Sequence, residues 1–80
     1  MIQQNSPKQD PMHPADIKAA LQKANSSAAQ IARELDISET AVAHVIYGRS
    51  SSLRIASKIA ERTGIDIHLI WPDRYNDEAA

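Results

Sequence analysis

Residues 27–48, SAAQIARELDISETAVAHVIYG, decide the fold, because their apolar side chains have the spacing of two short helices that meet across a tight turn. The expected core of this unit comprises Ile31, Ala32, Leu35, Ile37, Val42 and Val45. We expect Ala32 where the two helices approach most closely, since a larger side chain there would force them apart. The spacing predicts a helix-turn-helix unit and makes DNA binding the leading functional hypothesis.

The ends of these two helices carry residues that are typical of helix caps. Ser27, with Gln30 three residues later, matches a capping box that opens the first helix. Asp36 occupies the turn, where a left-handed backbone is expected, and Asp is one of the few residues besides Gly that tolerate it. Ser38 can cap the second helix, and Gly48 is typical of a helix C-terminus.

Apolar residues repeat at helical spacing on both sides of the unit. Pro14 suits the first position of a preceding helix. The backbone N–H at that position has no partner within the helix, so Pro loses no hydrogen bond by lacking it. A later repeat begins at Leu53 and ends at Gly64, and Asp66 can cap a final short turn. The expected helices span about residues 14–24, 27–35, 39–47 and 53–63, with a short turn at about 66–71. The pattern predicts an all-α fold, a compact four- to five-helix bundle that contains the helix-turn-helix.

Length and composition limit the possible classes of function. A chain of 80 residues can form one small domain but is too short for a deep core with a separate catalytic cleft. The sequence contains no Cys, and His13, His44 and His68 do not have the spacing of a zinc motif. A Gly-rich phosphate loop is also missing. We therefore expect no enzymatic activity, no cofactor, no metal site and no small-molecule ligand.

The chain is expected to divide into a leader, one domain and a tail. Residues 1–12 contain Pro and amide side chains without apolar periodicity, which predicts a disordered leader. The helix-turn-helix domain is expected over residues 13–75, and a flexible tail over 76–80. The polar N-terminal segment does not look like a targeting sequence, and no apolar run has the length of a membrane span. The sequence therefore predicts a soluble cytoplasmic protein without a membrane partner.

The charge is low for a DNA-binding domain. The formal net charge is −1, whereas most such domains carry a basic excess that releases counterions from phosphates. The distribution is more favourable, because Arg49, Arg54 and Lys58 follow the second helix of the unit with no acidic residue among them. These features predict modest non-specific affinity, and they favour either a homodimer on DNA or strong base contacts.

Two flanking segments carry a resemblance to a known family. One is HPADI at residues 13–17, and the other is IWPDRY at residues 70–75. With the helix-turn-helix between them, the chain resembles the Ner/Nlp family of small phage and bacterial transcriptional regulators, whose fold is similar to that of lambda-type repressors. The resemblance implies a sequence-specific DNA-binding regulator, often a repressor of phage early transcription. The chain departs from the family at residues 48–52, GRSSS, where a Trp-Pro segment is common, so contacts of that loop do not carry over.

The expected base contacts lie on the second helix of the unit, because its N-terminal part enters the major groove in helix-turn-helix proteins. The side chains opposite Val42 and Val45 are Ser38, Glu39, Thr40, Ala43, His44 and Tyr47. For Thr40 and His44 the alternative is a solvated helix face. For Glu39 this alternative is stronger, since its charge favours the helix N-terminus and is repelled by phosphate.

Expected phosphate contacts flank the same helix, at the start of the preceding helix and in the loop that follows. They are Ser26, Ser27, Arg49, Ser50, Ser51 and Arg54. Ser27 has an alternative role as a helix cap, which does not depend on DNA.

The remaining expectations concern the C-terminal aromatic residues and the partner. Trp71 and Tyr75 are expected to close the small core, with a dimer contact as the alternative. The expected partner is double-stranded DNA. The main alternative function is a protein-interaction or antitoxin-type regulatory module with the same fold, since low net charge and short Ala-rich helices permit it.

Overall fold

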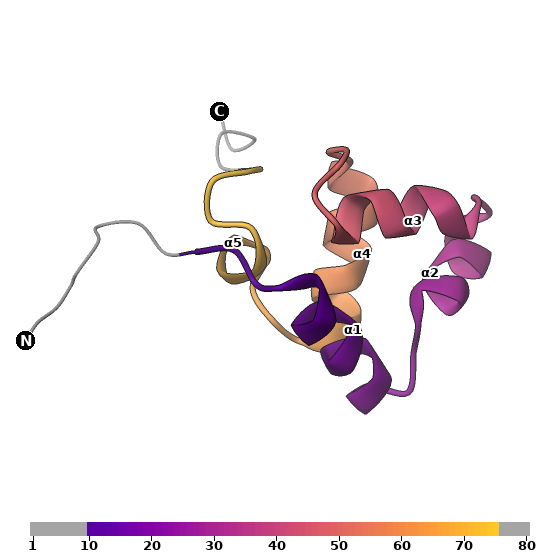
Figure 1. Ribbon diagram of the computed structural model, residues 1–80. Helices are drawn as coiled ribbons and strands as arrows, with labels where there is room; N and C mark the ends of the chain where they lie inside the picture. Colours follow the sequence, from indigo (N-terminus) through magenta and orange to yellow (C-terminus); the bar gives the residue numbers. More distant parts are fainter. Residues whose placement is uncertain (1–9, 76–80) are drawn as a thin grey trace, which may run out of the picture.

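The computed structural model describes residues 10–75, and within this range the regular structure is entirely helical (Figure 1). In chain order the helices are α1 (Pro14–Lys23), α2 (Ala28–Leu35), α3 (Glu39–Ile46), α4 (Leu53–Thr63) and α5 (Ile67–Ile70). This architecture confirms the predicted all-α class and the number of helices. No observed helix end differs from its expected position by more than one residue.

The N-terminus of each helix is capped by a side chain that accepts a hydrogen bond from the first turn. The capping residues are His13, Ser27, Ser38, Ser52 and Asp66. The capping box expected at Ser27 forms only in part. Ser27 Oγ accepts from the backbone N–H of Gln30 at 3.1 Å, but the Gln30 side chain pairs with Arg33 and Glu34 instead of turning back. Hydrogen bonds to charged groups are stronger than the neutral return bond of a capping box, which accounts for the difference.

Three successive helices end in the same type of turn. The residue in the left-handed region is Asn25 after α1, Asp36 after α2 and Gly48 after α3, with φ of 60°, 59° and 78°. In each turn the next N–H donates to a carbonyl five residues earlier, namely Ser26 to Leu21 (2.8 Å), Ile37 to Ala32 (3.0 Å) and Arg49 to His44 (2.7 Å). These are Schellman motifs, which satisfy carbonyl groups that a helix end leaves unpaired. Asp36 thus adopts the left-handed conformation that the sequence predicts for the corner.

The core is aliphatic apart from one Trp. Its buried members are Ile17, Leu21, Ile31, Ala32, Val42, Val45, Ile46, Ile55, Ala56, Ile59, Ile70 and Trp71. Helix α4 packs against each of the other four helices, while α2 and α3 form the most extensive helix pair. In Figure 1, α4 runs through the middle of the domain and α3 lies across its upper part. Trp71 is only 4% exposed, so the predicted role in closing the core is observed, and the alternative of a dimer contact at this side chain is excluded by its burial.

The N-terminal and C-terminal segments of the described chain meet beside the core. The N–H of Met12 donates to the carbonyl of Ile70 at 3.0 Å, and the half-buried Met12 side chain packs against the core. Met12 therefore contacts the domain although it lies one residue before the expected boundary at His13. Residues 1–9 of the expected leader, and the expected tail, residues 76–80, lie outside the described residues.

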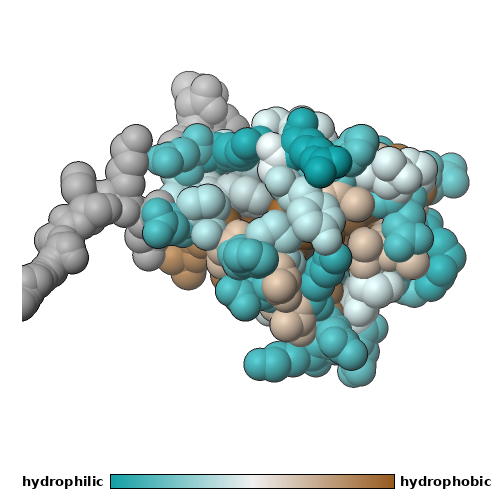
Figure 2. Space-filling model, in the orientation of Figure 1, coloured by the Kyte–Doolittle hydropathy of each residue, from teal (hydrophilic) through white to brown (hydrophobic). Residues whose placement is uncertain are grey.

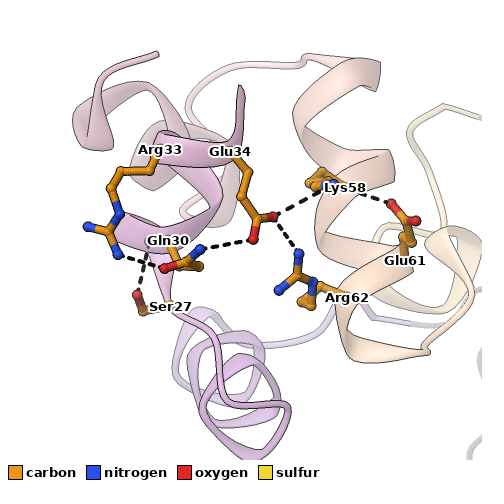
Figure 3. Close-up of polar contacts among 7 residues, drawn as sticks. All are labelled: Ser27, Gln30, Arg33, Glu34, Lys58, Glu61 and Arg62. Atoms are coloured by element: carbon orange, nitrogen blue, oxygen red, sulfur yellow. Dashed lines mark hydrogen bonds and ion pairs between the residues drawn. The ribbon is translucent and has the colours of Figure 1, made fainter. Parts of the chain in front are cut away.

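A polar network joins the exposed sides of α2 and α4 (Figure 3). The Glu34 carboxylate accepts from Gln30 Nε2 at 3.0 Å and from Arg62, and Lys58 Nζ lies 3.7 Å from the same carboxylate. The hydrogen bond from Gln30 and the one from Arg62 lower the pKa of Glu34 below its ordinary value of 4.5, with the charges of Arg62 and Lys58 acting in the same direction. The network therefore favours ionised Glu34 in the folded state.

The surface is mainly polar on the face drawn in Figure 2, where brown atoms form small separate areas. Large exposed apolar side chains occur on three different segments, as Tyr47, Leu53 and Leu69. No helix within residues 10–75 combines the length and hydropathy that a membrane-spanning segment requires.

Candidate nucleic-acid interface

The position of α3 is set by its buried face. Val42 and Val45 are fully buried, and Ile46 is 2% exposed. On α2, Ile31 and Ala32 are also buried and Leu35 is half-buried against the core. Ile37, in the turn between α2 and α3, is half-buried there too. The two short helices therefore form one rigid unit, since each buries its apolar face against the other and against α4.

The side of α3 that faces away from this core is solvent-exposed. Most of the expected base contacts are exposed on it, namely Ser38, Glu39, Thr40, His44 and Tyr47. Ala43 is half-buried, so only part of its methyl group faces solvent. Ser38 also caps the helix, because its Oγ accepts from the N–H of Ala41 at 3.1 Å. The face presents hydroxyl groups, one imidazole and one phenol, which are groups that can hydrogen-bond base edges.

Tyr47 has a partner that the sequence does not reveal. Lys18 of α1 donates from its ammonium to Tyr47 Oη, and its Nζ lies 4.7 Å from the centre of the Tyr47 ring. Helices α1 and α3 are separate in the sequence, so only their packing brings this cation to the end of α3. In the sequence Lys18 follows Ile17, which is buried, but the sequence does not identify the helix that lies beside Lys18.

The loop over residues 48–52 follows α3 and carries several of the expected phosphate contacts. Arg49, Ser50 and Ser51 are exposed. No residue within 10–75 forms a hydrogen bond or an ion pair with the Arg49 side chain. Ser52 differs from its neighbours, because its hydroxyl caps α4 by accepting from the N–H of Ile55.

Arg74, a residue of the C-terminal segment, holds the backbone of this loop. Its Nη2 donates to the carbonyl of Gly48 at 3.1 Å, and its Nη1 donates to Ser51 Oγ at 3.0 Å and approaches the carbonyl of Ser50 at 3.5 Å. The sequence places Arg74 in the IWPDRY segment but does not reveal this role. No local pattern reveals a contact between residues that are more than 20 positions apart.

Three of the expected phosphate contacts have side chains that are bonded or buried within the fold. Arg54 donates through Nη2 to the carbonyl of Leu35 at 2.8 Å, which ties the start of α4 to the end of α2. The Ser26 hydroxyl oxygen is buried, so in this conformation it is not accessible to a phosphate, contrary to the expectation for this residue. Ser27 is exposed, but its Oγ is used as the cap of α2.

The basic segment after α3 carries less unbalanced positive charge than its composition suggests. Lys58 lies 3.7 Å from carboxylate oxygens of both Glu34 and Glu61, so much of its charge is locally balanced. Lys18 contacts Tyr47 at the end of α3, Arg49 lies in the loop that follows, and Arg74 is bonded to the same loop. Among the described residues 10–75, no three His, Asp or Glu side chains cluster in a way that could hold a metal ion.

A comparison with known families gives one match that covers most of the chain. The model of a family described as winged helix-turn-helix DNA-binding matches residues 11–80. No curated protein and no solved structure gives a significant match. The wing of such domains is ordinarily made of β-strands. Residues 10–75 form no strand, and α3 is followed directly by the loop and α4.

Proposed function

The chain belongs to the winged helix-turn-helix DNA-binding family, and from this premise we propose that it binds double-stranded DNA with α3 in the major groove. The observation that carries the proposal is the two-sided character of α3. Val42 and Val45 are fully buried on one side, while Thr40 and His44 are exposed on the other. Such a helix is held rigidly and presents a row of polar side chains, which base readout requires.

Each side chain of this row has a role that follows from its chemistry. Thr40 offers a hydroxyl to a base or phosphate and a methyl group to thymine, and His44 can donate to a guanine acceptor. Tyr47, Ala43 and Ser38 extend the contact along the groove. Glu39 can accept from the amino group of cytosine, and otherwise it serves the N-terminus of α3.

The main phosphate contacts are proposed at the C-terminal end of α3 and in the loop that follows it. Arg49 supplies the main charge, with the hydroxyl groups of Ser50 and Ser51 beside it. At the start of α2, the backbone N–H groups near Ser27 form a second anchor. Arg54 contributes a more distant charge, since its guanidinium is already bonded to the carbonyl of Leu35.

We further propose that the protein is a transcriptional regulator of the Ner/Nlp type and that it acts as a phage-type repressor. Both segments that carry this resemblance have structural tasks that support it. His13 of the first segment caps α1, and Arg74 and Tyr75 of the second contact the loop after α3. The net charge of −1 supports binding as two copies on a repeated or palindromic site, because one copy has few cations to offer to phosphates.

Selection of binding sites from random duplexes tests this function. We expect one preferred sequence for the wild-type protein and a changed preference at single positions for Thr40→Ala and His44→Ala. Lys23→Ala is the matched control, because Lys23 is an exposed cation at the C-terminus of α1, which lies well below α3 in Figure 1. If Thr40→Ala and His44→Ala select the same sequence as the wild type, the assigned face is wrong.

A protein-docking function is the second candidate, and two observations favour it. Glu39 is exposed at the N-terminal tip of α3, and Lys58 is paired with acidic side chains rather than available to DNA. The dependence of affinity on salt separates the candidates, since added salt lowers the free-energy gain from counterion release and therefore weakens DNA binding steeply. A flat salt profile, or no binding to any duplex, would favour docking on a protein.

A further inference from the structure

The C-terminal segment makes a continuous set of contacts with the loop over residues 48–52. Arg74 donates to the carbonyl of Gly48 and to Ser51 Oγ, and Tyr75 Oη accepts from the backbone N–H of Ser52 at 3.3 Å. These bonds hold the first residue and the last two residues of the loop. The loop is thus held by side chains from a segment that follows α5.

The C-terminal segment is itself anchored to the core. Trp71 is buried, and its ring meets the Tyr75 ring edge to face, with the two centres 5.5 Å apart. The carbonyl of Tyr75 lies 3.1 Å from His68 Nε2, and the N–H of Arg74 donates to the carbonyl of Trp71 at 3.2 Å. The loop is therefore bonded to a fixed support rather than to a free chain end.

Tyr75 has a backbone conformation that requires such support. Its φ is 58°, in the left-handed region that is disfavoured for a bulky residue other than Gly. Its ring, hydroxyl and carbonyl are each held by a contact with Trp71, Ser52 and His68 respectively. The contacts compensate for the disfavoured backbone and aim the hydroxyl at the loop.

We propose that Arg74 and Tyr75 are positioning residues for DNA binding, which fix the loop after α3 so that Arg49 meets the phosphate backbone in one geometry. This inference rests on the proposed function of Arg49. Arg74 suits the task because its planar guanidinium donates in fixed directions to several acceptors at once, which a Lys ammonium cannot reproduce. Ordering the loop before binding removes an entropic cost that would otherwise weaken the complex.

Amide hydrogen exchange in the protein without DNA tests the first half of the proposal. In Arg74→Gln we expect the N–H groups of Arg49, Ser50 and Ser52 to exchange about tenfold faster, because loss of a charge-assisted bond has an effect of that order. In Tyr75→Phe, which keeps the ring against Trp71, the N–H of Ser52 alone is expected to exchange faster. Unchanged rates in both variants, with the amides of α2 and α4 as internal reference, would overturn the proposal.

Binding to the selected duplex tests the second half. Arg74→Gln is expected to lower the affinity about tenfold in the wild-type background and less than about threefold in the Arg49→Ala background, since the two residues act through one contact. Equal losses in both backgrounds would mean that Arg74 acts independently of Arg49 and would overturn the proposal. Lys23→Gln is the control for loss of one positive charge, and we expect it to bind like the wild type.

A conservative variant separates geometry from charge. Arg74→Lys keeps the charge but not the fork, so we expect an affinity within about threefold of Arg74→Gln. Full recovery by Lys would show that charge alone matters and would overturn the positioning role. If the wild-type protein binds no duplex, the proposed function fails, whereas the exchange rates still decide whether Arg74 and Tyr75 order the loop.

Discussion

Lys18 of α1 donates to Tyr47 Oη at the C-terminal end of α3 and lies 4.7 Å from the centre of the Tyr47 ring. The contact combines a hydrogen bond with a cation–π interaction, and it fixes the orientation of an exposed phenol on the proposed recognition face. Tyr47 is 48% exposed, so without Lys18 its side chain would sample several rotamers.

Loss of the Lys18 ammonium should therefore act through Tyr47. We expect Lys18→Met and Tyr47→Phe each to lower affinity for the selected duplex, and the double variant to be no weaker than Tyr47→Phe alone, as measured in a double-mutant cycle. Lys23→Met is the control for the same substitution on α1. If the losses of affinity were additive, Lys18 would contribute to DNA binding independently of Tyr47.

Arg49 should contribute to affinity for every sequence rather than to sequence preference. We expect Arg49→Ala to weaken binding to all duplexes and to reduce the slope of log affinity against log salt by about 0.9, the value for one phosphate contact on duplex DNA. Titrations over a range of salt concentrations measure the slope. An unchanged slope would remove Arg49 from the phosphate contacts.

Ala32 should not tolerate a larger side chain. It is 4% exposed on the side of α2 that packs against the core, so Ala32→Leu is expected to destabilise the domain by about 1–3 kcal/mol through overpacking. Denaturant unfolding measures the change. Ala19→Leu introduces the same side chain at an exposed position of α1 and is expected to have little effect. Equal stability of the two variants would contradict the assigned packing of Ala32.

Two glycines allow backbone strain to be separated from loop geometry. Gly48 and Gly64 have φ of 78° and 77°, so substitution by Ala should cost about 1–2 kcal/mol at each position. A Cβ at Gly64 would have no neighbour within 4 Å, and a Cβ at Gly48 would make only an ordinary contact, 3.9 Å from Arg74 Nη2, so the two substitutions differ in that the strain at Gly48 falls on the loop after α3. We expect similar melting temperatures for the two variants but weaker DNA binding only for Gly48→Ala. Equal affinity of both variants would argue against a role for the loop.

The Glu34 network makes stability depend on pH. Because the folded-state pKa of Glu34 is lowered below 4.5, ionised Glu34 stabilises the folded state above that pH, and the stabilisation is lost as pH falls through the folded-state pKa. We expect the wild type to melt at a higher temperature than Glu34→Gln near neutral pH, with the difference shrinking below pH 4.5 and at high salt. A difference that is constant with pH would refute the electrostatic origin.

The sequence predicts those features that depend on local chemistry. Ser38 and Asp66 cap their helices as expected, and Asp36 takes the left-handed turn, because each of these roles needs only neighbouring backbone groups. The buried face of α3 follows from helical periodicity in the same way. The roles of the exposed residues in DNA binding remain predictions.

Contacts between distant segments are the part that the sequence does not predict. The packing of the chain brings Arg74 and Lys18 to their partners. Lys58 looks unpaired in the sequence but forms an ion pair with Glu34, because α4 lies beside α2. Ser26 is covered for the same reason. Side-chain type indicates what each group can do, but only the tertiary arrangement decides which groups are occupied.

The short corner between α2 and α3 has a consequence for the order of folding. Its closing bond joins Ile37 to Ala32, so the most extensive helix pair forms across a few residues and has a small loop-closure entropy. The packing of α1 on α4, by contrast, must close a loop of about thirty residues. We therefore expect α2 and α3 to dock in the folding transition state, so that Ala32→Gly slows refolding while truncation of Ile17 mainly speeds unfolding. The unit proposed to meet DNA would then also be the nucleus from which the domain assembles.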